Sequence, residues 1–444
     1  HIFNNFAMHS APTRNSAAKQ EVVEDAFDVS LVMLPYNDIV QYSRGEKDNN
    51  GNIQRKCQKA ISEAFGLSSS CLGILCITDM PESYCNLRSQ LLPLARILAD
   101  EMKSSPVEEN DLVVPEASYT VGWSHGVEKV GDDFDIGKGS FYANPLYDDY
   151  VAIDGVREEL VTVETDRNDT KLPKGLVFEN LLKDNPAFFA SNVWPTDVAD
   201  DRLEKLEPTF KQMGVFARNI CIKVAEAIDG YVSTVSANYK GKVGNVLSQS
   251  RYCKGRLLHY FSMNDVKKMK NAQTNTETEM KINEEVADWC GWHNDHGSLT
   301  ALIPAMYLDP SGEVVDCPDP KSGLYVMSKS GVLKHVTLPP RSMAVQVGET
   351  TQIHTGGLVQ ATPHCVRGCH NQDSVHITRE TFAVFFEPEF HGDMEIHAEG
   401  RSLDETQTQE AEKFLPPSVK TLRSRWKPGM SFGEFSEATF SAFH

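Results

Sequence analysis

The sequence predicts an α+β protein in which helices support a barrel or sandwich of short strands. Helical periodicity dominates the first half of the 444 residues, whereas strand-like segments dominate the part after Gly230. These segments are short, rich in β-branched and aromatic residues, and separated by Gly, Pro, Asp and Asn, which is the usual pattern of strands joined by turns. Several helices followed by many short strands favour the α+β class.

The first half of the chain contains two predicted strands and three predicted helices. The segment DVSLVMLPYNDI predicts a short strand that ends at Pro35, and the apolar run CLGILCI at 71–77 predicts a second strand. Apolar residues recur at intervals of three and four in 53–65, 84–102 and 203–228. Each of these ranges is therefore predicted to form an amphipathic helix with one buried face.

Two segments without a sustained apolar period interrupt these elements. Residues 106–176, rich in Gly, Asp and Tyr, predict loops and short strands laid over the core, and residues 262–288 predict a solvated insertion. The predicted strands of the second half are LLHYF, LTALIPAMYL, GLYVMS, VLKHVTL, SMAVQVG and TFAVFFEP. We divide the chain into four predicted parts, which are a flexible arm 1–20, a mixed helical region 21–230, a β-core 231–390 that contains the insertion, and a helical extension 391–444.

Charge and hydropathy argue against several classes of partner. The formal net charge of −19 and the pI near 5.2 argue against nucleic acid and anionic membranes, because binders of polyanions need a basic surface. The sequence shows neither an apolar run of about 18 residues nor a secretory leader. We expect a cytoplasmic monomer. The first acidic residue is Glu21, so a remnant of an organelle-targeting segment is the alternative interpretation of the polar N-terminus.

Ten cysteines are spread along the chain, mostly inside apolar runs. This distribution predicts free thiols in a reducing compartment, because a disulfide framework is typical of short secreted domains. Cys365, Cys369 and His370 form a C-x3-C-H pattern that is compatible with zinc, but no second ligand pair follows at finger or ribbon spacing. We therefore expect no disulfide bridge, and we interpret Cys365 as a packed thiol.

The stretch WHNDHGSL at 292–299 contains the first candidate metal ligands. Side chains alternate between the two faces of a strand, so His293 and Asp295 point the same way and His296 points the other way. An imidazole and a carboxylate suit Fe(II), Mn(II) or Zn(II), but two ligands alone do not make a tight site. A third ligand must come from the later histidines, which are His335, His354, His364, His370 and His376.

His364 is the best candidate for the third ligand. It begins the extended run ATPHCVRG directly after a turn at Gly356 and Gly357, whereas His354 lies in the turn itself. Two histidines and one carboxylate on one face of an octahedral iron leave three adjacent positions open, which is the arrangement of non-haem Fe(II) oxygenases.

A candidate anion site follows in the run RETFAVFFEP. Arg379, Thr381, Ala383 and Phe385 share one face of this predicted strand, which places a guanidinium and a hydroxyl inside an apolar barrel. An arginine that points inward needs an anion, and a carboxylate matches its planar fork. The alternative is a structural salt bridge.

The order of these motifs over residues 255–388 resembles the isopenicillin N synthase-like group of Fe(II)- and 2-oxoglutarate-dependent dioxygenases. In that family H-x-D, a distant H and R-x-S/T occur in this order, as they do in HNDHGSL, TGGLVQATPHCV and RETFAVFFEP. The strand SMAVQVGE, between the first two, is similar to the family's V-x-x-G-D/E strand. The resemblance implies a double-stranded β-helix, or jelly roll, with helices packed on one sheet.

The resemblance also implies roles for individual residues. The iron ligands would be His293, Asp295 and His364. The residues that bind the distal carboxylate of 2-oxoglutarate would be Arg379, Thr381 and Tyr260. The implied reaction consumes O2 and 2-oxoglutarate, releases succinate and CO2, and oxidises a small molecule, usually by hydroxylation.

Three features depart from the family pattern. Leu258 stands where the family has an asparagine, and Cys365 stands where an arginine usually follows the distal histidine, although Arg367 comes two residues later. The segments that precede the H-x-D and R-x-T motifs are longer than usual, which predicts insertions near the mouth of the barrel. Two alternatives therefore stay open: an iron oxidase that does not use 2-oxoglutarate, and a catalytically silent ligand-binding protein of the same fold.

Overall fold

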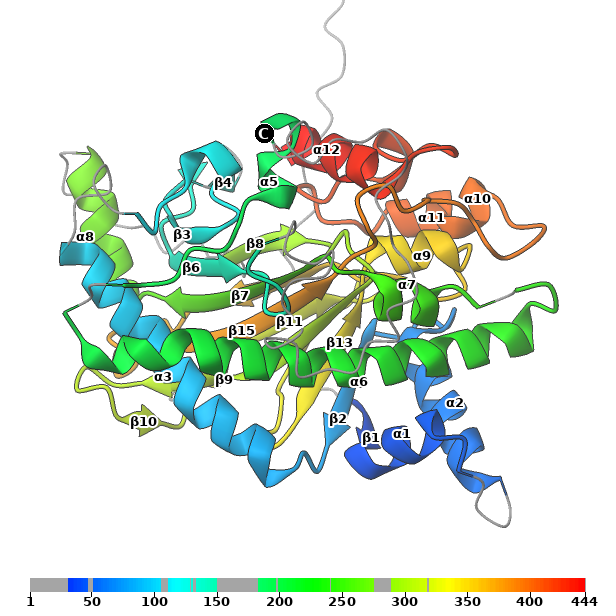
Figure 1. Ribbon diagram of the computed structural model, residues 1–444, viewed down its shortest axis with the longest axis horizontal. Helices are drawn as coiled ribbons and strands as arrows, with labels where there is room; N and C mark the ends of the chain where they lie inside the picture. Colours follow the sequence, from blue (N-terminus) through cyan, green and yellow to red (C-terminus); the bar gives the residue numbers. More distant parts are fainter. Residues whose placement is uncertain are drawn as a thin grey trace, which may run out of the picture.

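The computed structural model describes ten ranges, which are 31–46, 51–104, 111–127, 129–130, 133–149, 183–196, 199–239, 241–274, 289–317 and 319–443 (Figure 1). Within them, helices and strands are arranged around one large sheet, which confirms the predicted mixture of helices and strands. The predicted arm 1–20 lies outside the described residues. None of the helices in the described ranges is both long enough and apolar enough to cross a lipid bilayer.

The large sheet has the strand order β1-β2-β13-β9-β15-β7-β6-β3, with β10 paired to β9. Only the β1–β2 pair is parallel among the strands of this sheet. Its members are β1 (Val32–Pro35), β2 (Ile74–Thr78), β3 (Gly122–His125), β6 (Lys138–Ala143), β7 (Cys253–Tyr260), β9 (Leu299–Leu308), β10 (Val314–Val315), β13 (Met343–Val347) and β15 (Thr378–Phe386).

A smaller antiparallel sheet has the order β12-β11-β14-β8. Its strands are β8 (Cys290–His293), β11 (Gly323–Met327), β12 (Leu333–Val336) and β14 (His364–Arg367), and β4 (Lys129–Val130) pairs separately with β5 (Asp133–Phe134). One cluster of buried side chains joins Leu258 and Tyr260 of β7 and Ala383 of β15 to Val366 of β14. The two sheets therefore pack on each other around a shared interior.

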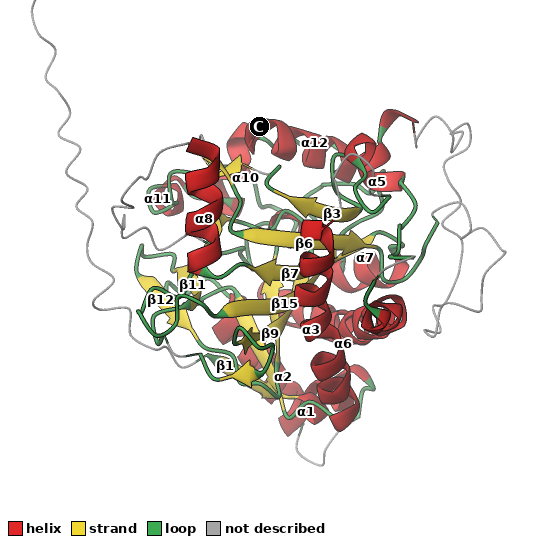
Figure 2. Ribbon diagram, turned by 90° about the vertical axis from the view of Figure 1, so that its left-hand side faces the viewer, coloured by secondary structure: helices red, strands yellow, loops and turns green. Residues whose placement is uncertain are grey.

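Two long helices cover the other face of the large sheet (Figure 2). They are α3 (Glu82–Ser104) and α6 (Leu206–Val235), and Phe210 of α6 meets Phe382 of β15 with ring centres 4.8 Å apart. Around α6 pack α1 (Tyr36–Ser43), α2 (Asn52–Phe65) and α7 (Val243–Gln249). The predicted helices at 53–65, 84–102 and 203–228 are thereby confirmed, because their apolar faces are buried in the main core.

Three local predictions differ from the structure. Within the segment predicted as a solvated insertion, residues 263–274 form α8 (Met263–Thr274), whose first turn is capped by Ser262 and anchored by buried Val266. Strands β3 and β6 belong to the large sheet, whereas the prediction laid this region over the core. His354 is the last residue of α9 (Glu349–His354), and the turn comes later, at Gly356 and Gly357.

The chain after β15 gathers at one end of the two sheets (Figure 1). Its elements are α10 (Leu403–Thr406), α11 (Gln409–Glu412), the 3-10 turn Leu422–Ser424 and α12 (Phe432–Phe443), while α5 (Pro186–Phe189) and the 3-10 turns Pro115–Ala117 and Asp201–Lys205 lie earlier in the chain. Arg425 forms a bidentate ion pair with Glu349 at the start of α9, with an Nη1–Oε2 distance of 2.8 Å and an Nη2–Oε1 distance of 2.6 Å. Asn294 also donates to Glu349, so this ion pair braces the loop between His293 and Asp295.

The Arg425–Glu349 pair provides a test of how strongly the C-terminal segment supports the fold. The side chains of both residues are at most 2% exposed. We expect Arg425→Ala to lower the free energy of unfolding by about 3–5 kcal/mol, because the Glu349 carboxylate would remain buried without its partner. Urea unfolding measures this loss. Arg341→Ala, which removes an exposed pair with Glu82, should cost less than about 1 kcal/mol, and equal losses would contradict the account.

Candidate active site

The structure brings His293, Asp295 and His364 together in the small sheet. β8 and β14 are neighbours, and His293 is directly opposite His364 in their register. Asp295 follows two residues after the end of β8, and its Oδ1 lies 3.8 Å from the Nε2 atom of each histidine. The two imidazole centres are 4.3 Å apart, and one ligand atom from each of the three residues lies within 4.8 Å of the others. These three side chains can therefore share one metal ion.

Hydrogen bonds orient all three groups for this role. Nδ1 of His293 donates to the Gly291 carbonyl at 2.8 Å, and Nδ1 of His364 donates to the Thr362 carbonyl at 3.2 Å. A carbonyl can only accept, so the proton of each neutral ring sits on Nδ1, and Nε2 presents its lone pair to the shared centre. The Thr300 hydroxyl donates to Oδ2 of Asp295 at 2.6 Å, which leaves Oδ1 to face the histidines. This donor set fits a divalent first-row metal.

The electrostatics of the three groups differ. Burial lowers the pKa of His364 to about 4, so its imidazole is neutral. Burial also lowers the pKa of His293, but Cys290 and Asp295 outweigh burial and raise it to about 9. Burial raises the pKa of Asp295, yet the two histidines bring it below its ordinary value. Metal binding therefore displaces a proton from His293, as is usual when a metal replaces a proton on a ligand.

The hydrogen bond from Thr300 gives a prediction about metal affinity. Thr300→Val keeps the shape of the side chain but frees Oδ2 of Asp295, so the carboxylate can rotate away from the histidines. We expect Fe(II) affinity to fall by about 10–100-fold. Competition with a chelator whose absorbance reports free metal measures the change. The matched control is Thr351→Val, because the Thr351 hydroxyl is also buried but donates to the Ser298 carbonyl; equal losses in both variants would contradict the prediction.

Arg379 lies in the interior between two tyrosines. In the register of the large sheet it is opposite Tyr260 of β7 and Tyr307 of β9, and its guanidinium carbon is 4.9 Å from the Tyr260 ring centre. The side chain is buried, and its Nε and Nη1 atoms have no hydrogen-bond partner. No carboxylate in the described ranges pairs with it, which argues against the alternative of a structural salt bridge. Unpaired buried donors of this kind are the complement of a carboxylate ligand.

Solved structures share this architecture over almost the whole chain. A full-length protein from Neurospora crassa, solved in complex with alpha-KG, has a TM-score of 0.54 and 20% identity and covers 95% of this chain and 98% of its own. A 2OG-Fe(II) oxygenase family protein from Caulobacter crescentus has a TM-score of 0.53 and 15% identity and covers 94% and 99%. The chain has the fold of a 2OG-Fe(II) oxygenase. No protein-family model matches the sequence, and the search of curated proteins finds no match.

Tyr307 is a residue of this oxygenase fold that sequence reasoning missed. Burial lowers the pKa of Arg379, but the hydroxyls of Tyr260 and Tyr307 outweigh burial and raise it. Tyr307 sits near the end of LTALIPAMYL, where alternation alone does not say what it faces. Its place beside Arg379 depends on the pairing of β9 with β15, which includes an irregularity between Glu380 and Phe382.

The remaining predicted co-substrate residues have contrasting surroundings. Tyr260 is buried against Trp289, with ring centres 5.4 Å apart, and faces Arg379. Thr381 lies on β15, two residues after Arg379, and its hydroxyl donates to the Ile303 carbonyl at 2.7 Å. Leu258, opposite Thr381 in the register, contributes only apolar surface. Thr381 therefore has no free proton for a carboxylate in this structure.

The other histidines have different partners. His335 contacts the Ser322 carbonyl, and His296 faces Glu387 at 3.6 Å and stacks on Phe432, as expected for a side chain that points away from the triad. His354 forms a second cluster with Asp393 and His397. In this cluster the Asp393 carboxylate pairs with the Lys242 ammonium at 2.8 Å, so the lysine already supplies the positive charge that a metal ion would bring.

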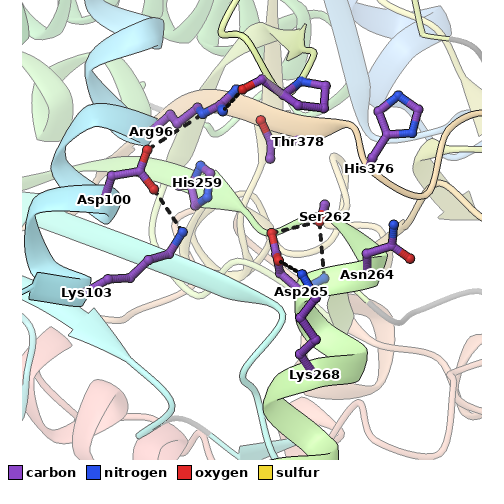
Figure 3. Close-up of a pocket in the computed structure, with 11 residues that line it drawn as sticks. Arg96, Asp100, Lys103, His259, Ser262, Asn264, Asp265, Lys268, His376 and Thr378 are labelled. Carbon is purple, nitrogen blue, oxygen red and sulfur yellow. Dashed lines mark hydrogen bonds and ion pairs between the residues drawn. The ribbon is translucent and has the colours of Figure 1, made fainter.

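A pocket of about 240 Å³ lies on the opposite face of β7 and β15, between α3 and α8 (Figure 3). Its lining includes Asp100, Lys103, His259, Asp265 and Lys268, and it contains none of the three candidate metal ligands. Lys103 pairs with Asp100 at 2.8 Å, and Lys268 pairs with Asp265 at 3.2 Å. Lys103 and Lys268 are thus already paired with carboxylates inside this pocket, and the pocket lacks the candidate metal ligands. The candidate site is therefore the interior that contains the triad.

Proposed function

We propose that the protein is an Fe(II)- and 2-oxoglutarate-dependent dioxygenase that oxidises a small molecule and releases succinate and CO2. The observation that carries this proposal is the convergence of His293, Asp295 and His364 on one centre, in an interior that also holds the unpaired Arg379 guanidinium. The fold supports the same assignment, because similar structures include a protein bound to alpha-KG.

In this function, the side chains of His293, Asp295 and His364 would hold Fe(II). The bound iron supplies the oxidative decarboxylation of 2-oxoglutarate and the oxidation of the substrate. Arg379 holds the distal carboxylate of 2-oxoglutarate, and Tyr260 and Tyr307 fix the guanidinium on both sides. We assign Thr381 a smaller share, because its hydroxyl proton is held by the Ile303 carbonyl.

The rest of the interior keeps water away from the reacting centre. Leu258 and Ala383 belong to the buried cluster that joins the two sheets, and the partly buried Phe385 packs against it. All three lie on the same face of their strands as Tyr260 and Arg379. A dry, apolar wall strengthens the attraction between Arg379 and a carboxylate. It also protects a reactive oxidant from side reactions with solvent.

We further propose that the two sheets form a double-stranded β-helix, or jelly roll, within residues 231–390. The facing sheets and their shared cluster support this description. The division into an arm 1–20, a mixed region 21–230 and an extension 391–444 stays a prediction. The cytoplasmic location and the monomeric state also stay predictions.

A metabolite screen that detects succinate tests the proposed function. Purified protein with Fe(II), 2-oxoglutarate and O2 should release succinate in proportion to oxidation of one class of small molecule. A second structure of the Neurospora crassa protein contains alpha-KG and thymine, and it has a TM-score of 0.52 and 18% identity over 95% of this chain and 99% of its own. Pyrimidine bases therefore belong in the screen. His293→Ala should release no succinate.

The two alternatives give different results in this screen. An iron oxidase that does not use 2-oxoglutarate would consume O2 and substrate without succinate, in a reaction that still needs His293. A silent binding protein would consume neither, and the wild type would then behave as His293→Ala. Either result would overturn the proposed function.

A further inference from the structure

Two cysteines, Cys317 and Cys369, lie beside the interior that holds Arg379. Both belong to the same side-chain cluster as Tyr260 and Tyr307. Cys369 is fully buried, whereas Cys317 is partly exposed. All ten cysteines are free thiols, as the sequence predicts, so neither of these two is committed to a disulfide.

Short contacts hold the two thiols close to each other. The Cys317 sulfur lies 3.2 Å from the Asp319 carbonyl oxygen, and the Cys369 sulfur lies 3.3 Å from the Ser322 hydroxyl oxygen. The Ser322 amide in turn donates to the Asp319 carbonyl at 3.0 Å, and the Asp319 carboxylate accepts from the His370 amide at 2.8 Å. These bonds tie the segment that follows Cys317 to the segment that follows Cys369.

The same contacts make Cys317 the more reactive of the two. A hydrogen bond from the Cys369 thiol to the Cys317 sulfur is the largest influence on Cys317 and lowers its pKa to about 6. Because the thiolate is the nucleophilic form of cysteine, this lowered pKa makes the Cys317 sulfur the better nucleophile of the pair. By contrast, burial raises the pKa of Cys57 to about 12. Oxidation should therefore favour Cys317 over buried thiols of this kind.

Tyr307 links this pair to Arg379. Its hydroxyl donates to the Cys317 sulfur, and Tyr307 is also directly opposite Arg379 in the pairing of β9 with β15. The tyrosine therefore contacts the thiol pair on one side and the guanidinium on the other. A change in the charge or position of the Cys317 sulfur should therefore alter how Tyr307 holds the Arg379 guanidinium.

We propose that Cys317 and Cys369 are a peroxide-sensitive thiol pair whose oxidation to a disulfide weakens 2-oxoglutarate binding at Arg379. The second half of this statement rests on the proposed function, whereas the first half does not. A disulfide sulfur carries no negative charge and lies about 2.0 Å from its partner. Cys317 would thus stop accepting from Tyr307, and the tyrosine would lose the contact that holds it beside the guanidinium.

The oxidant is hydrogen peroxide, and the chemistry balances in two steps. The Cys317 thiolate attacks one peroxide oxygen: the S–O bond forms, the O–O bond breaks, and the hydroxide released takes up the proton that Cys317 had given up. The sulfur of Cys369 then attacks the Cys317 sulfenic acid. The S–S bond forms, the S–O bond breaks, and the Cys369 proton leaves with the hydroxide as a second water.

The first experiment tests the thiol pair without reference to catalysis. Metal-free protein is treated with hydrogen peroxide, which avoids iron-driven side reactions, and its peptides are mapped by mass spectrometry. We expect a Cys317–Cys369 cross-link that dithiothreitol reverses. In Cys369→Ser, Cys317 should instead be trapped as a sulfenic acid by dimedone. Cys85→Ser, at a partly exposed cysteine outside the pair, should cross-link as the wild type does; absence of the cross-link in the wild type overturns the proposal.

The second experiment measures 2-oxoglutarate binding by calorimetry with Ni(II) in place of iron, so that no turnover occurs. We expect the oxidised protein to bind 2-oxoglutarate about tenfold more weakly, the effect of losing one hydrogen bond in a charged network, and dithiothreitol to restore binding. A cross-link with unchanged affinity overturns the link to Arg379. If neither form binds 2-oxoglutarate, that link fails with the proposed function, while the cross-link still supports the thiol pair.

Discussion

Replacing His364 by alanine is expected to weaken Fe(II) binding by at least about 100-fold and to abolish turnover of 2-oxoglutarate. His364 is the only member of the triad that comes from β14, so its loss leaves the adjacent His293 and Asp295 with no partner across the sheet. Two ligands from one strand end cannot fix an open face of iron. Anaerobic titration with Fe(II) and competition with a chelator measure the affinity.

Two other histidines serve as controls for this variant. His376 is exposed at the pocket behind the sheet, so His376→Ala should leave metal binding unchanged. His296 follows Asp295 in the sequence, but its imidazole faces Glu387. Metal binding in His296→Ala should therefore change far less than in His364→Ala. Equal losses in His296→Ala and His364→Ala would mean that the ligand set is wrong.

Replacing Arg379 by methionine is expected to raise the KM for 2-oxoglutarate on the order of 100-fold or more. The guanidinium is buried with two unpaired nitrogen atoms, so the carboxylate that binds it gains charge-assisted hydrogen bonds in a low-dielectric interior. Methionine keeps much of the volume but offers no donor. Because this contact orients the co-substrate before any chemistry, the KM should change more than kcat. Steady-state succinate release at varied 2-oxoglutarate measures both.

Two measurements distinguish a binding role of Arg379 from a structural role. They are the free energy of unfolding of Arg379→Met and the KM of a variant at the neighbouring Thr381. No carboxylate in the described part of the chain is left alone when Arg379 is replaced, so Arg379→Met should not lower the free energy of unfolding. Thr381→Val should raise the KM by no more than about tenfold, because its hydroxyl already donates to a backbone carbonyl. A destabilised Arg379→Met protein with an unchanged KM would make Arg379 a structural residue.

Local sequence patterns predict much of this fold and all three members of the triad. The strand predicted at LTALIPAMYL coincides with β9, and the three predicted helices are present, because the period of two in a strand and of 3.6 in a helix is set by the backbone alone. His293 and Asp295 do share one centre and His296 faces Glu387, but β8 ends at His293, so strand alternation does not place Asp295 and His296. The position of His364 at the start of an extended run is also a local signal.

Features that depend on pairing between distant segments could not be predicted in this way. Tyr307 reaches Arg379 only through the register of β9 with β15, which a strand pattern does not specify. The hydrogen bond from Thr381 to Ile303 also depends on this pairing. The brace from Arg425 to Glu349 joins residues 76 positions apart, with no motif to mark it.

Anaerobic addition of Fe(II) and then 2-oxoglutarate to the metal-free protein, followed by visible spectroscopy, tests the central claim most directly. The account predicts a weak charge-transfer band that appears only when both are present. The band should be absent in His364→Ala and should need much more 2-oxoglutarate in Arg379→Met. A wild-type protein that forms no band, or a His364→Ala protein that forms it at the same Fe(II) concentration, would contradict the shared metal centre.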